Sequence, residues 1–265
     1  MGDIEGGQNI VTIMDRGINS ELEWWRSLKM KIGVICEGQT DFIAIGTFLT
    51  EELANLGHSV EFIAIQPAQD STLPAGWTQV LFWLINNTIE HRIAAHIRGN
   101  SLFEGDDTEK VDAFLFQLDT DIIGETAFEE FLRGRGFVPP AGATPADRAS
   151  AIEVLLKTIS LYDAQTCAQK LLHIYAPIVE SSETWIVGAA KMHPDPESLA
   201  GQNLCDAFGR VKSQVLNEPP LTTYGNINKR IGTRRKICSA VCANSSIVAL
   251  CPHFVQIRDK IVSLV

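Results

Sequence analysis

The chain has 265 residues, of which 45% are hydrophobic and 20% are charged, and its formal net charge is −10. This composition excludes a disordered or low-complexity polypeptide, and the length allows a substantial buried core without disulfide bonds. The longest apolar runs, such as 80–85, are too short to cross a bilayer, so we expect a soluble cytoplasmic protein with six reduced cysteines and no membrane partner. The acidic balance weighs against nucleic-acid binding, because phosphate contacts normally come from Lys and Arg.

The predicted elements begin after a weakly patterned lead-in at 1–30, in which one short helix is expected at 21–28. Short apolar runs rich in β-branched residues predict strands at 31–36, 58–65, 112–118 and 171–179. Helical spacing of apolar residues predicts helices at 41–56, 77–97, 124–132 and 147–161, with Gly57 just past the end of the first. Residues 137–145 are typical of a linker, and from 193 onward the sequence is loop-rich and then helical.

Strands that alternate with helices are typical of an α/β fold with a mostly parallel sheet. We therefore predict a four-stranded, Rossmann-like sheet with flanking helices. The chain then divides into the lead-in at 1–30, a main domain at 31–190, and a helical extension at 191–265 that packs on the sheet.

Two acidic motifs follow predicted strands. Residues 37–41 (EGQTD) follow the first strand, and residues 119–125 (DTDIIGE) follow the third. Ligands of open α/β sheets bind beyond the carboxyl ends of the strands, and crossover rules commonly place strands one and three side by side. The carboxylates of Glu37, Asp119 and Asp121 are therefore expected to converge, and such a cluster of hard oxygen ligands favours Mg²⁺ or Mn²⁺. Gly38 and Gly124 are expected to allow tight turns close to the ligand.

This pair of motifs resembles the signature of the Toprim domain, which occurs in primases, topoisomerases and several nucleases. The resemblance covers roughly residues 31–190. It implies a parallel Toprim sheet, a divalent metal on the two aspartates, and Glu37 as metal ligand or general acid/base. The residues that match the pattern are Glu37, Asp41, Asp119, Asp121, Gly124 and Glu125.

A looser resemblance extends into the C-terminal part of the chain. Residues 183–189 (ETWIVGA), 224–235 and 251–254 are similar to an uncharacterised bacterial Toprim-like family associated with phage defence. Nucleases of the overcoming-lysogenization-defect type use extra carboxylates near a second metal, and Glu183 or Glu180 would be such a ligand here. A first-turn acid at the start of a helix is the alternative for Glu183. The same context leaves open an ATPase or other defence-system partner and an oligomer.

A dense basic run provides the candidate contacts to nucleic-acid phosphates, and a solvated helix face is its alternative interpretation. We expect the C-terminal extension to fold back beside the carboxyl edge of the sheet and to turn this run toward the metal. The run comprises Lys229, Arg230, Arg234, Arg235 and Lys236. A zinc site is disfavoured for Cys238, Cys242, Cys251 and His253, because their spacing is unusual and their neighbours are apolar.

The functional hypothesis is a metal-dependent nuclease that hydrolyses phosphodiesters, in antiviral defence or nucleic-acid processing, with Glu37, Asp119 and Asp121 as catalytic residues. The chain is too short for the additional domains of a topoisomerase, and no template-binding module of a primase is visible. The alternative is a Toprim-fold regulatory protein that senses a nucleotide or a partner, which the acidic net charge favours.

Overall fold

The computed structural model describes residues 29–67, 76–98, 110–161, 172–219, 230–243 and 245–265. The expected helix at 21–28, together with Lys229 of the basic run, lies outside this part of the chain. Within the described residues, no helix combines the length and the apolar character needed to cross a membrane.

The protein has an α/β fold built on a four-stranded sheet, with strand order β2-β1-β3-β4 and every neighbouring pair parallel. The strands are β1 (Met30–Ile35), β2 (Val60–Gln66), β3 (Ala113–Asp119) and β4 (Leu172–Ile178). All four strands were predicted to within two residues at each end. The alternation of apolar strand runs with helical segments was therefore sufficient to identify the parallel sheet.

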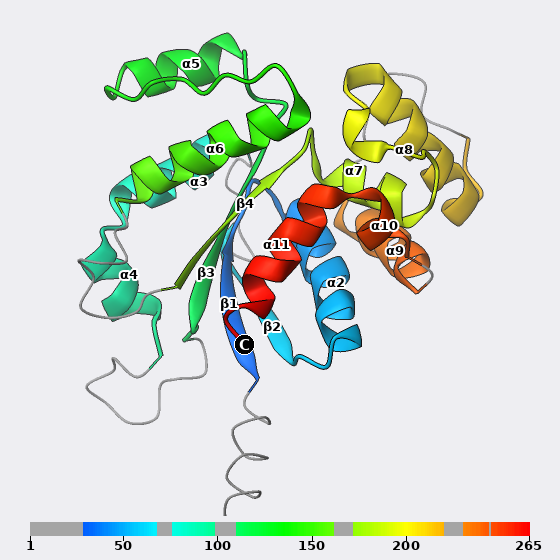
Figure 1. Ribbon diagram of the computed structural model, residues 1–265, viewed down its shortest axis with the longest axis horizontal. Coiled ribbons are helices and arrows are strands. Elements are labelled where there is room, and N and C mark those ends of the chain that lie inside the picture. Colours follow the sequence, from blue (N-terminus) through cyan, green and yellow to red (C-terminus); the bar gives the residue numbers. More distant parts are fainter. Residues whose placement is uncertain (1–28, 68–75, 99–109, 162–171, 220–229, 244) are drawn as a thin grey trace, which may run out of the picture.

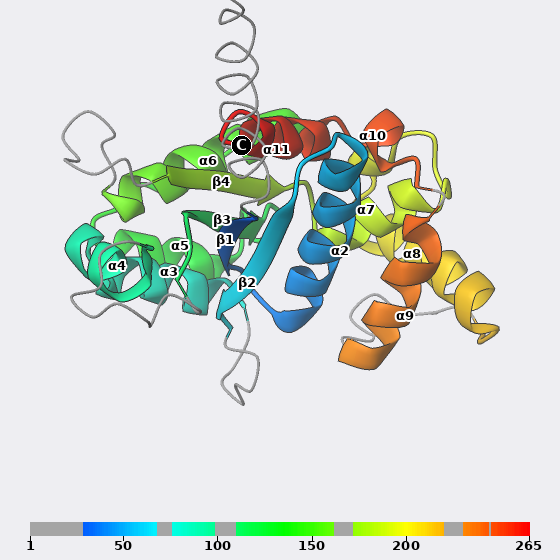
Figure 2. The ribbon, with the colours of Figure 1, turned by 90° about the horizontal axis from the view of Figure 1, so that it is seen from below.

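Helices cover both faces of the sheet (Figures 1 and 2). One face carries α2 (Gln39–Asn55), α7 (Ser182–Ala189), α8 (Gly201–Leu216), α9 (Ile231–Cys242), α10 (Ile247–Leu250) and α11 (Pro252–Val262). The other face carries α3 (Trp77–Asn86), α4 (Ile89–His96), α5 (Thr126–Arg133) and α6 (Pro145–Ser160). A short 3₁₀ helix, η1 (Pro196–Ser198), joins α7 to α8.

The two faces correspond to two hydrophobic clusters divided by the alternation of side chains along each strand. In β3, Ala113 and Leu115 join the cluster under α2 and the C-terminal helices, whereas Phe114 and Phe116 join the cluster under α3 and α6. Successive side chains of a strand point to opposite faces. Residues 117 and 119 consequently share the face of α2 and α7, and this periodicity positions the site described below.

One predicted helix is wrong: residues 77–97 form two helices rather than one. Asn87 leaves the helical conformation with φ −108° and ψ 98°. The side-chain oxygen of Thr88 then caps α4 by accepting a hydrogen bond from the backbone N–H of His91 at 3.3 Å. Short polar side chains compete with helical backbone hydrogen bonds, so the Asn87-Thr88 pair ends one helix and begins the next.

The other helices predicted within the described residues are present with shifted ends. Helix α6 begins at Pro145, two residues before the predicted start, because Thr144 and Asp147 form a reciprocal capping box. Gly57 follows the end of α2 with φ 85°, the left-handed conformation expected of a glycine in that position. The described residues after 193 are mainly helical, as predicted, and they pack against α2, α7 and β4.

Candidate functional site

The two acidic motifs lie side by side at the carboxyl edge of the sheet. Strand β1 pairs directly with β3, with Val34 opposite Leu115 and Ile35 opposite Phe116. The chain leaves β1 toward Glu37 and leaves β3 at Asp119, so both motifs begin at the same edge. In Figure 1, helix α7 follows β4 at this edge, and α8 and α9 lie beyond it.

A closed set of hydrogen bonds joins the two motifs. The side chain of Glu37 accepts a hydrogen bond from the backbone N–H of Asp119 at 2.7 Å. Gln117, which is fully buried, accepts from the backbone N–H of Glu37 at 3.2 Å and donates from Nε2 to Asp119 Oδ1 at 2.7 Å. Because Gln117 and Asp119 are two residues apart on one strand, both side chains lie on the same face. The structure thus brings Glu37 and Asp119 together as the sequence predicted.

The loop that carries Asp121 is fastened to the end of β4. The backbone N–H of Thr120 donates to the carbonyl of Ile178 at 3.0 Å, and that of Asp121 donates to the carbonyl of Glu180 at 3.2 Å. The Thr120 hydroxyl accepts from the backbone N–H of Glu180 at 2.8 Å. Asp121 itself is exposed at the surface. The second motif is therefore held rigidly from both sides while one of its acids faces solvent.

Asp119 is the most strongly perturbed acid of the cluster, with only 8% of its surface exposed. Burial raises the pKa of its carboxyl well above the ordinary value of 3.8, and neighbouring carboxylates raise it further. These neighbours are Glu37, Asp41, Asp121 and Glu183. Like charges in a partly buried site disfavour ionisation, so this position gains from a nearby cation.

Asp41 and Glu183 occupy a second, enclosed part of the cluster. The buried Asp41 lies in the first turn of α2 and accepts a hydrogen bond from the Ser182 hydroxyl at 2.6 Å. Glu183, which follows Ser182 in the chain, lies in the first turn of α7 and is paired with Arg234 of α9. Burial by itself raises the pKa of Glu183, but Arg234 more than offsets this effect and the pKa is lowered. The structure thus gives Glu183 an arginine partner, and its first-turn position matches the alternative interpretation.

Glu180, the other acid considered for a second metal, is also buried and also paired. It forms an ion pair with Arg148 of α6. Its backbone adopts φ 55°, the left-handed conformation, at the bend between β4 and α7. The ion pair of Glu180 therefore holds α6 at this bend, and its backbone hydrogen bonds hold the loop of Asp121 there as well.

The basic run divides into buried and exposed side chains. Arg234 is 1% exposed and lies under α2 and α7, so its predicted contact with nucleic-acid phosphates is replaced by the pair with Glu183. Arg230, Arg235 and Lys236 are exposed. Arg235 and Ile231 line a hollow of about 210 Å³ that reaches the carboxyl edge, together with Gln39, Phe42, Ile43, Ala64 and Pro67. The extension thus folds back beside this edge.

The supporting residues of the motifs have distinct local roles. Gly124 has φ 92°, so the turn after Asp121 requires a left-handed residue, as predicted for a glycine. Gly38 is different, because its φ of −157° is extended backbone that any residue can adopt. Glu125 is exposed and precedes α5 without capping it through its side chain. Of the two motif glycines, Gly124 and not Gly38 has a backbone conformation that needs glycine.

The residue types at the open part of the cluster fit a hard divalent cation. Glu37, Asp119 and Asp121 offer only carboxylate oxygens, the donors that Mg²⁺ and Mn²⁺ prefer. Among the residues described, no three or more His, Cys, Asp or Glu side chains are already gathered in an arrangement that would hold a metal. Glu37 instead directs one oxygen to the backbone of Asp119. Mutual repulsion disfavours bringing these carboxylates together without a cation.

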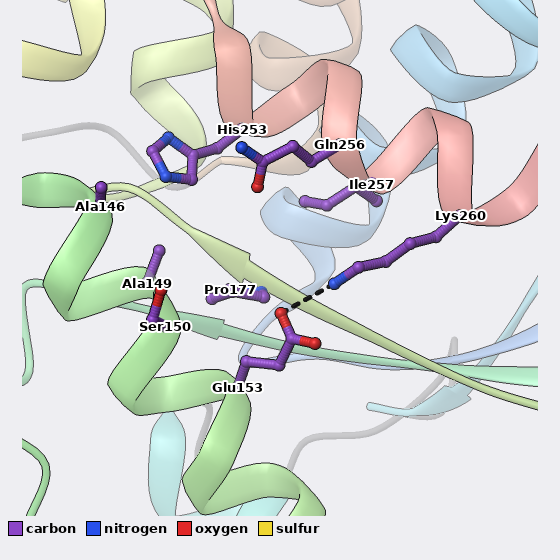
Figure 3. A pocket seen from close by; sticks show the side chains of 9 residues that line it. All are labelled: Ala146, Ala149, Ser150, Glu153, Pro177, His253, Gln256, Ile257 and Lys260. Atoms are coloured by element: carbon purple, nitrogen blue, oxygen red, sulfur yellow. Dashed lines mark hydrogen bonds and ion pairs between the residues drawn. The ribbon is translucent and has the colours of Figure 1, made fainter.

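A second hollow lies between α6 and α11, next to the end of β4 (Figure 3). Its volume is about 100 Å³. Lys260 crosses from α11 to α6 and contacts Glu153 at 2.8 Å, and His253 Nδ1 lies 2.6 Å from Glu197. The charged groups of this hollow are already paired, which favours a structural role. Its lining consists of Ala146, Ala149, Ser150, Glu153, Pro177, His253, Gln256, Ile257 and Lys260.

The C-terminal cysteines behave as buried apolar side chains. Cys238 and Cys251 are fully buried, and burial raises the pKa of both thiols, that of Cys238 to about 12. A thiol with a raised pKa is a poor metal ligand, because zinc binds the thiolate. His253, the fourth residue of the disfavoured zinc site, is paired with Glu197. Cys238 and Cys251 are thus buried, whereas Cys242 is half-buried.

Sequence reasoning missed three residues of the site. Gln117 could have been found, because it is a polar residue in an otherwise apolar buried strand, two positions before Asp119. Ser182 and Arg148 carry no comparable signal. Their partners, Asp41 and Glu180, are 141 and 32 residues away in the chain.

Replacing Gln117 by Leu should destabilise the folded chain by about 1–3 kcal/mol, because the amide N–H of Glu37 and the carboxylate of Asp119 would both lose a buried partner. Unfolding in urea, followed by circular dichroism, measures the effect. Gln214→Leu is the control, since Gln214 is exposed on α8. An unfolding free energy equal to that of the unmodified chain would show that the link between the motifs is unimportant.

Replacing Asp119 by Asn should leave the metal-free protein as stable as the unmodified chain or more stable at neutral pH. The pKa of Asp119 is higher in the folded state, so its ionisation costs stability as the pH rises from 3.8 through the folded-state value. Asn can still accept from Gln117. The advantage should shrink toward acid pH, and Mg²⁺ should raise the melting temperature of the unmodified chain only. Asp206→Asn, at an exposed position of α8, is the control. A clear loss of apo stability in Asp119→Asn would identify Asp119 as a structural residue.

Comparisons with known proteins add no further support to the site. No protein-family model, no curated protein and no solved structure matches the chain. The candidate site therefore rests on the motifs and on the geometry given above.

Proposed function

We propose that this chain is a Toprim-type nuclease that uses Mg²⁺ or Mn²⁺ to hydrolyse phosphodiester bonds, with a role in antiviral defence. The observation that carries the proposal is the direct hydrogen bond of 2.7 Å between Glu37, from the first motif, and Asp119, from the second. It joins the two motifs at the edge of a parallel sheet where ligands bind. Asp121 adds a solvent-facing acid two residues further on.

Each acidic residue has a role that follows from its environment. Asp119, buried and crowded by other carboxylates, gains most from a cation and would hold it together with Asp121. Glu37 is half-buried and would be either a ligand or the base that takes a proton from the attacking water. When bound, the divalent ion supplies an activated water and stabilises charge on the phosphoryl oxygens.

Nucleic acid needs a separate source of positive charge on a chain with a net charge of −10. Arg230, Arg235 and Lys236 are the exposed cations at the start of α9. Arg235 lines the hollow of about 210 Å³ together with Gln39, two residues from Glu37. The phosphates that flank the cleaved bond would lie along this side of the carboxyl edge.

The second candidate function is a regulatory protein that binds a nucleotide or a partner without cleaving it. The acidic net charge favours this alternative, and so does the burial of Arg234, which leaves fewer cations for phosphates. For this regulatory alternative, the expected partner is an ATPase or another defence protein. The two functions differ in whether the carboxylate cluster is needed for phosphodiester cleavage, which the next experiment decides.

Glu37→Gln should lower Mn²⁺-dependent cleavage by about 100-fold or more, the usual contribution of a general base. The purified chain is incubated with plasmid DNA, single-stranded DNA and RNA, with Mn²⁺ or with EDTA, and the products are separated by gel electrophoresis. Glu130→Gln, at an exposed position of α5, should keep full activity. Absence of Mn²⁺-dependent cleavage by the unmodified chain, or equal cleavage by Glu37→Gln, would favour the regulatory alternative.

The double variant Arg235→Ala, Lys236→Ala should weaken nucleic-acid binding to a similar extent for all sequences. It should also reduce the salt dependence by about one unit of slope for each phosphate that is no longer neutralised. Binding is measured by fluorescence anisotropy with Ca²⁺ over a series of salt concentrations. Arg133→Ala, at an exposed position of α5, is the control. Unchanged affinity in the double variant would mean that a partner or another surface holds the nucleic acid.

A further inference from the structure

The ion pair between Arg234 and Glu183 is the most enclosed pair of charges at the carboxyl edge. The side chain of Arg234 is 1% exposed and that of Glu183 is 5% exposed. Arg234 donates from Nη2 to Glu183 Oε1, and its guanidinium carbon lies 5.2 Å from the centre of the Phe208 ring of α8. Helices α7, α8 and α9 therefore enclose the guanidinium of Arg234 beside the carboxylate cluster.

The guanidinium is only partly satisfied by hydrogen bonds. Its buried Nε and Nη1 atoms have no hydrogen-bond partner among the described residues. Well-packed apolar side chains often replace a buried ion pair without loss of stability, and buried donors without acceptors are unfavourable. The fold alone thus gives little reason for an arginine here, and the positive charge is the property that this position provides.

This charge is directed at the enclosed half of the carboxylate cluster. Burial by itself lowers the pKa of Arg234, but Glu183 and then Asp41 more than offset this effect and the pKa is raised. Asp41 and Glu183 are linked through Ser182, whose hydroxyl donates to Asp41 at 2.6 Å. Both acids also act on Asp119. Arg234 therefore neutralises Asp41 and Glu183, two of the acids that raise the pKa of Asp119.

We propose that Arg234 is a built-in second cation, which occupies the place where Asp41 and Glu183 would otherwise recruit a second divalent ion. The site then takes a single divalent ion, held by Glu37, Asp119 and Asp121. The inference rests on the proposed metal-dependent function. Arg234 is a positioning residue, because its burial keeps it from touching a substrate.

The physical reason lies in the attachment of the cation. A second ion at Glu183 would have to displace a guanidinium that the packing of α9 on α2 holds in place, and it would meet that positive charge at close range. Arg234 shares one helical face with Ile237 and Cys238, which are also buried. It cannot swing into solvent without moving α9.

The test counts bound ions. Mn²⁺ binding to the purified full chain is measured by calorimetry, with free Mn²⁺ followed by electron paramagnetic resonance. We expect one ion per unmodified chain, and a second, weaker ion in Arg234→Met, where Asp41 and Glu183 lose their cation. The double variant Glu183→Gln, Arg234→Met removes both charges and should return to one ion. Arg210→Met, at an exposed position of α8, is the control and should bind one ion.

The outcomes separate this inference from the proposed function. Two ions in the unmodified chain would overturn the inference and leave the nuclease proposal intact, whereas no bound Mn²⁺ would overturn both. One ion in a folded Arg234→Met variant would reduce Arg234 to a structural residue. If that variant does not fold, the double variant decides: one bound ion supports the inference, and none or two overturn it.

Discussion

The hydrogen-bonded link between Glu37, Gln117 and Asp119 is the constraint on which the site depends. It requires β1 and β3 to be neighbours and to run in the same direction, so that both motifs leave the sheet at one edge. It also requires Gln117 and Asp119 to share a face, which the alternation along a strand ensures. The buried amide of Gln117 satisfies one group from each motif. A one-residue shift in register would separate the two acids and leave this amide without partners.

The carboxyl edge tolerates several buried acids because helices outside the sheet supply compensating cations. Arg148 of α6 reaches Glu180, and Arg234 of α9 reaches Glu183. These pairs neutralise the acids that follow β4, whereas Asp119 is surrounded mainly by other carboxylates. Compensation of the negative charge is therefore greatest on the enclosed side of the cluster and least on the open side. The proposed divalent cation would compensate the acids of the open side. The C-terminal helices are part of the site because α9 supplies Arg234.

Helix α9 shows how one basic run serves two purposes. Its buried face repeats at Arg234, Ile237 and Cys238, the spacing of a helix packed against α2 and α7. Arg235 and Lys236 lie off this face and are exposed. The periodicity therefore assigns one arginine to charge compensation and leaves its neighbours exposed to solvent. On an acidic chain this division matters, because phosphate contacts need exposed cations.

The sequence by itself determined the parallel α/β fold, the strand ends and the proximity of Glu37 to Asp119. These follow from local periodicity and from the rule that parallel strands deliver their carboxyl ends to one edge. Gln117 was missed but could have been found in the same way, as a polar residue in an apolar strand. Only the tertiary structure decided that Arg234 faces Glu183 and that Ser182 faces Asp41. These long-range pairs depend on how α2, α7 and α9 pack. Such packing leaves no periodic signal in the chain, so the division of the acids into compensated and open groups could be read only from the folded protein.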